Sequence, residues 1–410
     1  MSLVQRLRAP ALALATPAAA PLGRVLSWTL AAFGFFLPFS VAGTAIGMAI
    51  LAAMTLAAPR AAWHSRPWRD PAVAAGLLLF TYIAGHTLWT TGPTPAAWGL
   101  INRYHELLMG AVLFALFRLA PRPELFFRGF VCGVLFYAAV HWVGLVSSPV
   151  ARYLELRHIS AGLGMSLCAF MLLEQARSSQ RPWLLRGLAA FLAITVLFAV
   201  DGRTGYLVLL LLAAVAAWLQ SPRRWRWVSL VVVPLAVAAL ALSSSAVRHR
   251  IHETLAGTGP WINGAWHSTG IRIELVRVGG DVVLAHFATG AGYAEYGKAF
   301  ERAAQQRYGS DPVRREYLQQ YWIRPQNPHN EYLMQLAGGG VAALGLFLAW
   351  LVLPMLRTTV SPSARAGLAG IGLAFGTGCL FNSMLMDFVE GHVYVALMTW
   401  LLAQSAPRAP

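Results

Sequence analysis

Long apolar stretches separated by short polar connections run through almost the whole chain. Windows of about 19 residues predict roughly twelve membrane-spanning helices. The predicted centres of these spans are Ala32, Ala49, Leu79, Val112, Leu135, Met165, Ala193, Leu210, Ala236, Gly345, Leu373 and Leu397. The pattern therefore predicts an all-α polytopic membrane protein.

The polar connections alternate in their content of arginine. Arginines precede the first predicted span and then recur in every second connection, at Arg6, Arg8, Arg24, Arg60, Arg66, Arg69, Arg118, Arg122, Arg128, Arg177, Arg181, Arg186, Arg223, Arg224, Arg226, Arg357, Arg365 and Arg408. Because positively charged connections stay on the cytoplasmic side, both termini are predicted to be cytoplasmic and the alternate connections to face outward.

One outward connection, residues 243–328, is much longer than the others. It separates an N-terminal membrane bundle of about nine spans (1–242) from a C-terminal bundle of about three spans (329–410). Within the long connection, residues 268–287 carry an apolar stripe with arginines beside it, which is typical of an amphipathic helix lying over the membrane surface or against the bundle. The stripe consists of Ile273, Leu275, Val276, Val283 and Leu284.

Composition supports a membrane protein and restricts its partners. The 410 residues are 57% hydrophobic and 12% charged, whereas about a quarter of the residues of a soluble protein are charged. A net charge of +16 would suggest nucleic acid in a soluble chain, but here the arginines lie in the connections, so we expect membrane lipids and no nucleic acid. Cys132, Cys168 and Cys379 fall singly inside apolar stretches, so we expect no disulfide and no metal site from them.

His329 lies where a proline-punctuated polar run meets the apolar stretch of PHNEYLMQLAGGGVAALGLF. The unpaired N–H groups and the positive dipole at the start of that predicted helix disfavour an imidazolium. A neutral histidine at this place can act as a base. The alternative is a histidine that only caps or anchors the span.

Arginines on the outward side are informative because topology does not require them there. Arg203 lies in AVDGRTGY, a connection so short that its guanidinium is expected at the membrane boundary. It either binds a phosphate or pyrophosphate whose lipid tail stays in the bilayer, or reaches the interface or pairs with Asp201. Arg152 and Arg157 are further candidates for anion binding, chosen by side and charge alone.

Several common motifs are missing. The sequence has no Walker-type loop, no G-x-G-x-x-G and no H-E-x-x-H. Asp387 and Glu390 are a weak metal candidate, and we expect them to form hydrogen bonds or to pair with outward arginines. Few acidic residues lie in the spans, which disfavours an ion-coupled transporter. The combination predicts an enzyme without cofactor or metal, in which arginines stabilise a departing pyrophosphate and His329 deprotonates an acceptor hydroxyl.

Three segments resemble the O-antigen ligase and polymerase superfamily: PHNEYLMQLAGGGVAALGLF, DGRTG, and IRIELVRVGGDVVLAHFATGAGYAEY. Each motif is loose, but their order, spacing and common outward side make the match fairly specific. The chain departs from the family pattern at Gly338, Gly339 and Gly340, where many members carry Glu-x-Gly. This departure puts any role for that glutamate in doubt here.

The resemblance implies a GT-C-like glycosyltransferase of the bacterial inner membrane. It would transfer O-antigen polysaccharide from undecaprenyl pyrophosphate to lipid A–core on the periplasmic side, with inversion and without a metal. Carried over by motif, His329 would be the base or an acceptor-side group, and Arg203 and Arg272 would bind the pyrophosphate.

The nearest alternatives use the same lipid-linked donor. One is an O-antigen polymerase and another is a protein O-oligosaccharyltransferase, which commonly carries an additional C-terminal region; the expectation of a ligase rests partly on the short tail seen here. A transporter of lipid-linked sugars is an alternative of a different class, because outward arginines could bind pyrophosphate without chemistry.

Overall fold

The computed structural model describes residues 19–147, 158–256, 268–311 and 327–405, and within these ranges every regular element is a helix. The first group of helices is α3 (Ala19–Phe36), α4 (Val41–Ala57), α5 (Pro59–His64), η1 (Pro67–Arg69), α6 (Pro71–Thr91), α7 (Pro95–Arg103), α8 (Glu106–Leu119) and α9 (Glu124–Val146). The second group is α11 (His158–Ala176), α12 (Pro182–Phe198), α13 (Arg203–Gln220), η2 (Arg223–Trp225) and α14 (Arg226–Ser243). The remaining helices are α15 (Ser245–Ala256), α16 (Ser268–Ala285), α17 (Tyr296–Tyr308), α19 (Glu331–Val352), α20 (Pro362–Cys379) and α21 (Phe388–Ser405).

Every predicted span centre lies inside one of these helices, so the all-helical membrane architecture is confirmed. Six described helices are long and apolar enough to cross a membrane, and two bent pairs, α4 with α5–η1 and α7 with α8, bring the number to eight. The apolar parts of α3 and α12 are shorter. By length and composition alone, six to eight of the helices that contain a predicted centre therefore qualify as spans. The twelve centres lie in twelve separate helices, and the counts differ because α3, α12, α20 and α21 do not meet the length and composition test.

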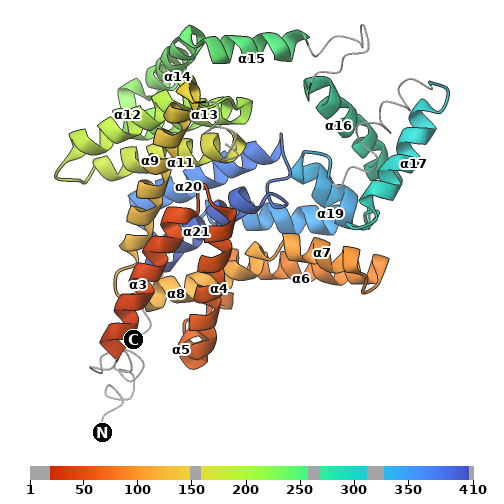
Figure 1. Ribbon diagram of the computed structural model, residues 1–410, viewed down its shortest axis with the longest axis horizontal. Helices are drawn as coiled ribbons and strands as arrows, with labels where there is room; N and C mark the ends of the chain where they lie inside the picture. The colour runs from red at the N-terminus through yellow and green to blue at the C-terminus, as the bar shows by residue number, and fades with distance from the viewer. Residues whose placement is uncertain (1–18, 148–157, 257–267, 312–326, 406–410) are drawn as a thin grey trace.

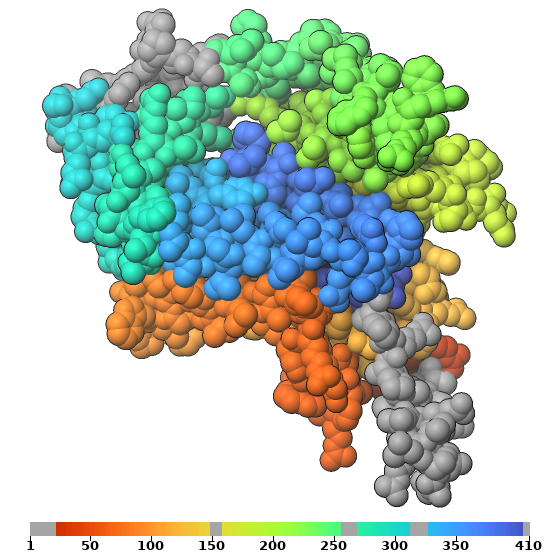
Figure 2. Space-filling model, turned by 180° about the vertical axis from the view of Figure 1, so that it is seen from behind, coloured from red at the N-terminus to blue at the C-terminus, as the bar shows by residue number. Residues whose placement is uncertain are grey.

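The helices form layers around α19. Figure 1 shows α19 and α6 side by side, with α16 and α17 at the outer end of α19, and α19 contacts both α6 and α16. From behind, the blue C-terminal helices lie between the orange N-terminal layer and the green and teal layer of α15 to α17 (Figure 2). The C-terminal helices thus pack into the N-terminal bundle, as the α8–α21 and α11–α20 contacts also show.

Connections that were predicted to share a side of the membrane touch one another. On the outward side, Ser160 donates a hydrogen bond to Oε1 of Glu390 at 2.6 Å. At the opposite end, Arg357 donates a hydrogen bond to Asp70, whose side chain also caps the N-terminus of α6. Each of these two contacts thus joins connections that were predicted to lie on the same side.

The described part of the long connection folds as α15, α16 and α17. Residues 268–285 are helical, as predicted, but the buried face differs from the predicted stripe. Leu275 and Val283 are buried, whereas Val276 and Leu284 are 45% and 81% exposed. The actual inner face continues through Val278 and Val282, three and seven residues after Leu275, because α16 packs on α17 and α19, as in the second of the two predicted placements.

Candidate active site

His329 lies immediately before α19, as the sequence predicted. Its φ of 50° is in the left-handed region, and its N–H donates a hydrogen bond to Oδ1 of Asn327 at 3.0 Å. The next residue, Asn330, caps the helix by accepting a hydrogen bond from the N–H of Leu333 at 2.9 Å. The Asn330 cap satisfies one of the N–H groups at the start of α19.

The imidazole is oriented by a side chain from the connection between α20 and α21. Nδ1 of His329 is 2.8 Å from Oδ1 of Asn382, and Nδ2 of Asn382 donates a hydrogen bond to Asp387. A carboxylate only accepts, so the amide nitrogen must face Asp387 and the amide oxygen must face His329. Nδ1 of His329 is therefore the protonated nitrogen, and in this tautomer Nε2 carries the lone pair.

The surroundings of His329 keep its ring neutral. Burial lowers the pKa of His329 below its usual value, and the nearby positive charge of Arg272 lowers the pKa further, against the opposing effect of the Asn382 hydrogen bond. A neutral imidazole with its lone pair on Nε2 is the form that can accept a proton near neutral pH.

Arg203 is the first residue of α13 and connects three helices. One of its guanidinium nitrogens donates a hydrogen bond to Oγ1 of Thr269 at 2.7 Å, and the other lies 3.4 Å from Oε2 of Glu253. Asp201, the alternative partner considered from sequence, instead binds Arg250 through both carboxylate oxygens, each at 2.5 Å. Arg203 is thus directed from α13 toward α15 and α16.

Arg272, on the first turns of α16, is only partly exposed. It forms no hydrogen bond or ion pair with a carboxylate among the described residues, whereas Arg277 on the same helix pairs with Glu274 at 2.8 Å. Burial lowers the pKa of Arg272, and the positive charge of Arg203 lowers it further. An unpaired guanidinium beside a second guanidinium favours the binding of an anion between them.

The structure thus brings together three residues that are far apart in sequence. The charge of Arg203 acts on Arg272, and the charge of Arg272 acts on His329. The other two candidates, Arg152 and Arg157, lie outside the described residues.

Sequence reasoning missed Asn382 as a site residue, and it considered Asp387 only as a weak metal ligand or a hydrogen-bonding group. Asp387 and Glu390 have separate partners, Asn382 and Ser160, so the expected hydrogen bonds are present. Within the described ranges, no group of three or more histidine, cysteine or acidic side chains could hold a metal ion. The signal for Asn382 is topological, because it lies two residues before the connection that begins near Met384, which was predicted to share a side with His329.

The glycine triplet that departs from the family pattern produces a kink in α19. Gly340 has a φ of 70°, so the carbonyl groups before it lose their helical donors. The turn after α16 replaces them: the N–H of Ala291 donates to the carbonyl of Ala337 at 2.7 Å, and the N–H of Gly292 donates to that of Gly338 at 3.0 Å.

A tyrosine from α6 supplies the hydrogen-bond donor for a third carbonyl group at the kink. The hydroxyl of Tyr82 donates a hydrogen bond to the carbonyl of Gly339 at 2.6 Å. A Cβ atom at Gly338 would lie 2.5 Å from the ring of Tyr293, so the contact requires glycine there. The triplet therefore holds the turn after α16, and with it the helix that carries Arg272, against the helix that begins beside His329.

A buried polar network lies next to His329, at the start of α19. Glu331, fully buried at the start of α19, accepts hydrogen bonds from Nε2 of Gln335 at 2.7 Å and from the N–H of Leu385 at 3.0 Å. The hydroxyl of Tyr293 donates to Oε1 of Gln335 at 2.6 Å. The network joins α19 to the turn after α16 and to the connection that carries Asn382.

Part of this region matches a known protein family. Residues 188–349 match the sequence model of the family described as O-antigen ligase. The matched segment runs from α12 into α19 and includes Arg203, Arg272 and His329, while Asn382 and Asp387 lie beyond it. No protein of curated function matches the chain.

Proposed function

We propose that this chain is an O-antigen ligase, a glycosyltransferase that joins O-antigen polysaccharide to lipid A–core; the match of residues 188–349 to the O-antigen ligase family model supports this proposal. The donor in this proposal is undecaprenyl pyrophosphate-linked O-antigen. The protein would lie in the bacterial inner membrane, with the long connection of residues 243–328 and the site on the periplasmic side.

The observation that carries the proposal is the convergence of one neutral imidazole and two guanidiniums. His329, Arg203 and Arg272 come from three helix ends, and their charges influence one another. A sugar on a lipid pyrophosphate already has a good leaving group. Its transfer therefore needs cations for the departing charge and one base for the acceptor hydroxyl.

The reaction follows from these roles. Nε2 of His329 takes the proton of the acceptor hydroxyl, and the acceptor oxygen attacks the anomeric carbon of the donor from the face opposite the pyrophosphate. The bond between that carbon and the pyrophosphate oxygen breaks, and its electron pair stays on the pyrophosphate, where Arg203 and Arg272 stabilise the charge. The products are an inverted glycosidic bond and undecaprenyl pyrophosphate.

A transfer assay tests this function. Purified protein is mixed with lipid-linked O-antigen and lipid A–core, with excess chelator and without nucleotide, and the lipopolysaccharide is analysed by gel mobility. The proposal expects a ladder with the wild type and none with His329→Ala.

Donor binding is measured in the same preparations. His329→Ala should still bind the lipid-linked donor, since the arginines remain. Longer lipid-linked chains without a ladder would replace the ligase by a polymerase, and transfer to a protein acceptor would replace it by a protein O-oligosaccharyltransferase. Movement of the donor across a vesicle membrane without any covalent product would identify a transporter.

A further inference from the structure

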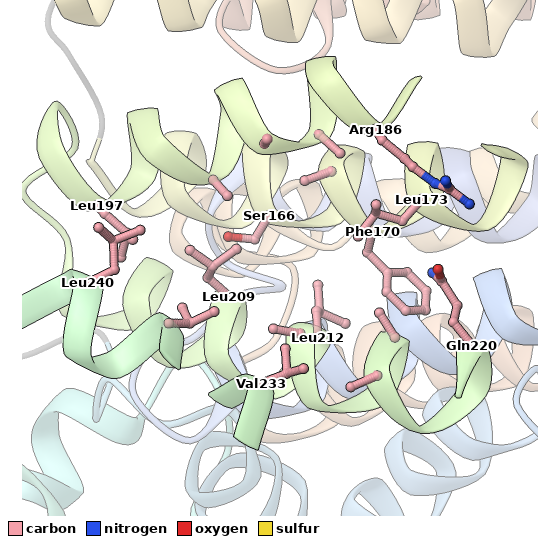
Figure 3. Close-up of a pocket in the computed structure, with 18 residues that line it drawn as sticks. Ser166, Phe170, Leu173, Arg186, Leu197, Leu209, Leu212, Gln220, Val233 and Leu240 are labelled. Atoms are coloured by element: carbon pink, nitrogen blue, oxygen red, sulfur yellow. The ribbon is translucent and has the colours of Figure 1, made fainter. Parts of the chain in front are cut away.

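An apolar cavity lies between α11, α12, α13 and α14 (Figure 3), and none of His329, Arg203 and Arg272 lines it. Its volume is about 370 Å³, within the range of roughly 300–1,000 Å³ for ligand pockets. Much of its lining is alanine, which leaves the space open, together with larger residues such as Phe170 and Leu212.

The cavity is bounded on one side by a helix that packs loosely. Ala241 is the one residue described as buried on α14, and Val231, Val232 and Leu235 are each more than half exposed. Pro234 lies inside this helix and removes one of its hydrogen bonds. The cavity therefore borders the lipid side of the bundle.

The two ends of the cavity differ in polarity. Figure 3 shows Leu197 and Leu240 at one end, and Arg186 and Gln220 at the other. The polar end is also the end of the bundle that carries arginine-rich connections on both sides, after α11 and after α13.

Arg186 has no acidic partner among the described residues. Glu174, the acid at this end, already accepts hydrogen bonds from Arg177 at 2.9 Å and from Gln220 at 3.4 Å. The guanidinium of Arg186 therefore borders an apolar space without an anion to neutralise it.

The geometry points to a binding site for an anionic phospholipid of the cytoplasmic leaflet, with an acyl chain in the cavity and the phosphate on Arg186. An acyl chain gains little by leaving the bilayer, because lipid tails are as apolar as the lining, so the headgroup charge must provide the selectivity. The opposite end offers no such group: Arg203 does not line the cavity and is bound to Thr269 and Glu253.

Lipid binding is tested on the full-length protein, delipidated in detergent and then mixed with phosphatidylglycerol or phosphatidylcholine. Native mass spectrometry counts the bound lipid, and thermal melting reports stabilisation. We expect phosphatidylglycerol to bind and stabilise, Arg186→Gln to lower its occupancy about tenfold, and Arg186→Lys to retain more of it. Arg181→Gln, an exposed arginine that does not line the cavity, is the matched control and should bind as the wild type does.

A second variant tests the cavity itself. Ala190→Phe fills the space from a position that is not packed in the core, and it should displace the lipid while leaving Arg186 in place. Equal binding of phosphatidylcholine, equal losses in Arg186→Gln and Arg181→Gln, or retention of lipid in Ala190→Phe would each overturn the proposal. Preferential retention of a polyprenyl phosphate would assign the cavity to the donor lipid instead. None of these readouts depends on transferase activity, so they stand apart from the test of the ligase.

Discussion

Asn382 accepts a hydrogen bond from Nδ1 of His329 at 2.8 Å and thereby determines which nitrogen of the imidazole can act as a base. The two residues come from different connections, one before α19 and one between α20 and α21. Asp387, which accepts a hydrogen bond from the amide of Asn382, fixes the orientation of that amide. The proposed base is therefore oriented by residues that lie outside the segment matched by the family.

Removal of the Asn382 amide should reduce turnover more than donor affinity. Asn382→Leu keeps the volume but loses the hydrogen bond, so we expect kcat to fall about tenfold and the KM for the donor to stay nearly unchanged. Steady-state transfer kinetics at several donor concentrations measure both constants.

A matched variant separates this effect from the helix cap. Asn330→Ser keeps a capping side chain at the start of α19 and loses only the hydrogen bond to the carbonyl of Leu380. It should retain most activity. A large rise in KM in Asn382→Leu, or an equal loss of kcat in both variants, would contradict a positioning role for Asn382.

The pH dependence of transfer should reflect His329. Since burial lowers its pKa below 6.5, the neutral base is fully present above that pH, and activity should fall only as the pH drops through the lowered pKa. Asn382→Asp combined with Asp387→Asn, which avoids two adjacent carboxylates, places one carboxylate on Nδ1–H and raises this pKa, so the acid limb should move to higher pH by about one unit or more. An acid limb that stays in place in this double variant would mean that another group accepts the proton.

Two arginines on α16 provide a matched pair. Arg272→Gln should lower kcat/KM by about 10- to 100-fold, as expected for the loss of a charge-assisted hydrogen bond to the donor of about 1.5–3 kcal/mol. Arg277→Gln removes a more exposed charge that pairs with Glu274 and should change kcat/KM little. The affinity for the donor, measured without acceptor, should likewise fall more in Arg272→Gln than in Arg277→Gln. Similar losses in both would indicate a general charge effect instead of a specific contact.

The kink in α19 should not tolerate a side chain. A Cβ atom at Gly340 would overlap the carbonyl group of Ala288, and φ is positive there, so Gly340→Ala should destabilise the fold by about 1–3 kcal/mol. Gly345, one turn later, has open space around it, and Gly345→Ala should be neutral or slightly stabilising. Thermal melting in detergent compares the two, and equal melting temperatures would contradict the importance of the kink.

Much of this architecture could be predicted from sequence because it depends on local patterns. Hydropathy located the helices, and the alternation of arginines placed His329 and Arg203 on one side. The contact between His329 and Asn382 could not be predicted, since it joins segments 53 residues apart. The buried face of α16 was misjudged at Val276 and Leu284 for a related reason, because a helix that packs on two other helices buries a face that periodicity alone does not specify.

The exchange of hydrogen bonds at the kink has a consequence for engineering. Ala291 and Gly292 supply donors to Ala337 and Gly338, so the extramembrane segment and the first half of α19 form one structural unit. A chimaera that imports only the long connection from a homologous protein would separate these donors from their acceptors and leave buried carbonyl groups unsatisfied. Such a chimaera should therefore fold only when the segment from α16 through Gly340 is transferred whole.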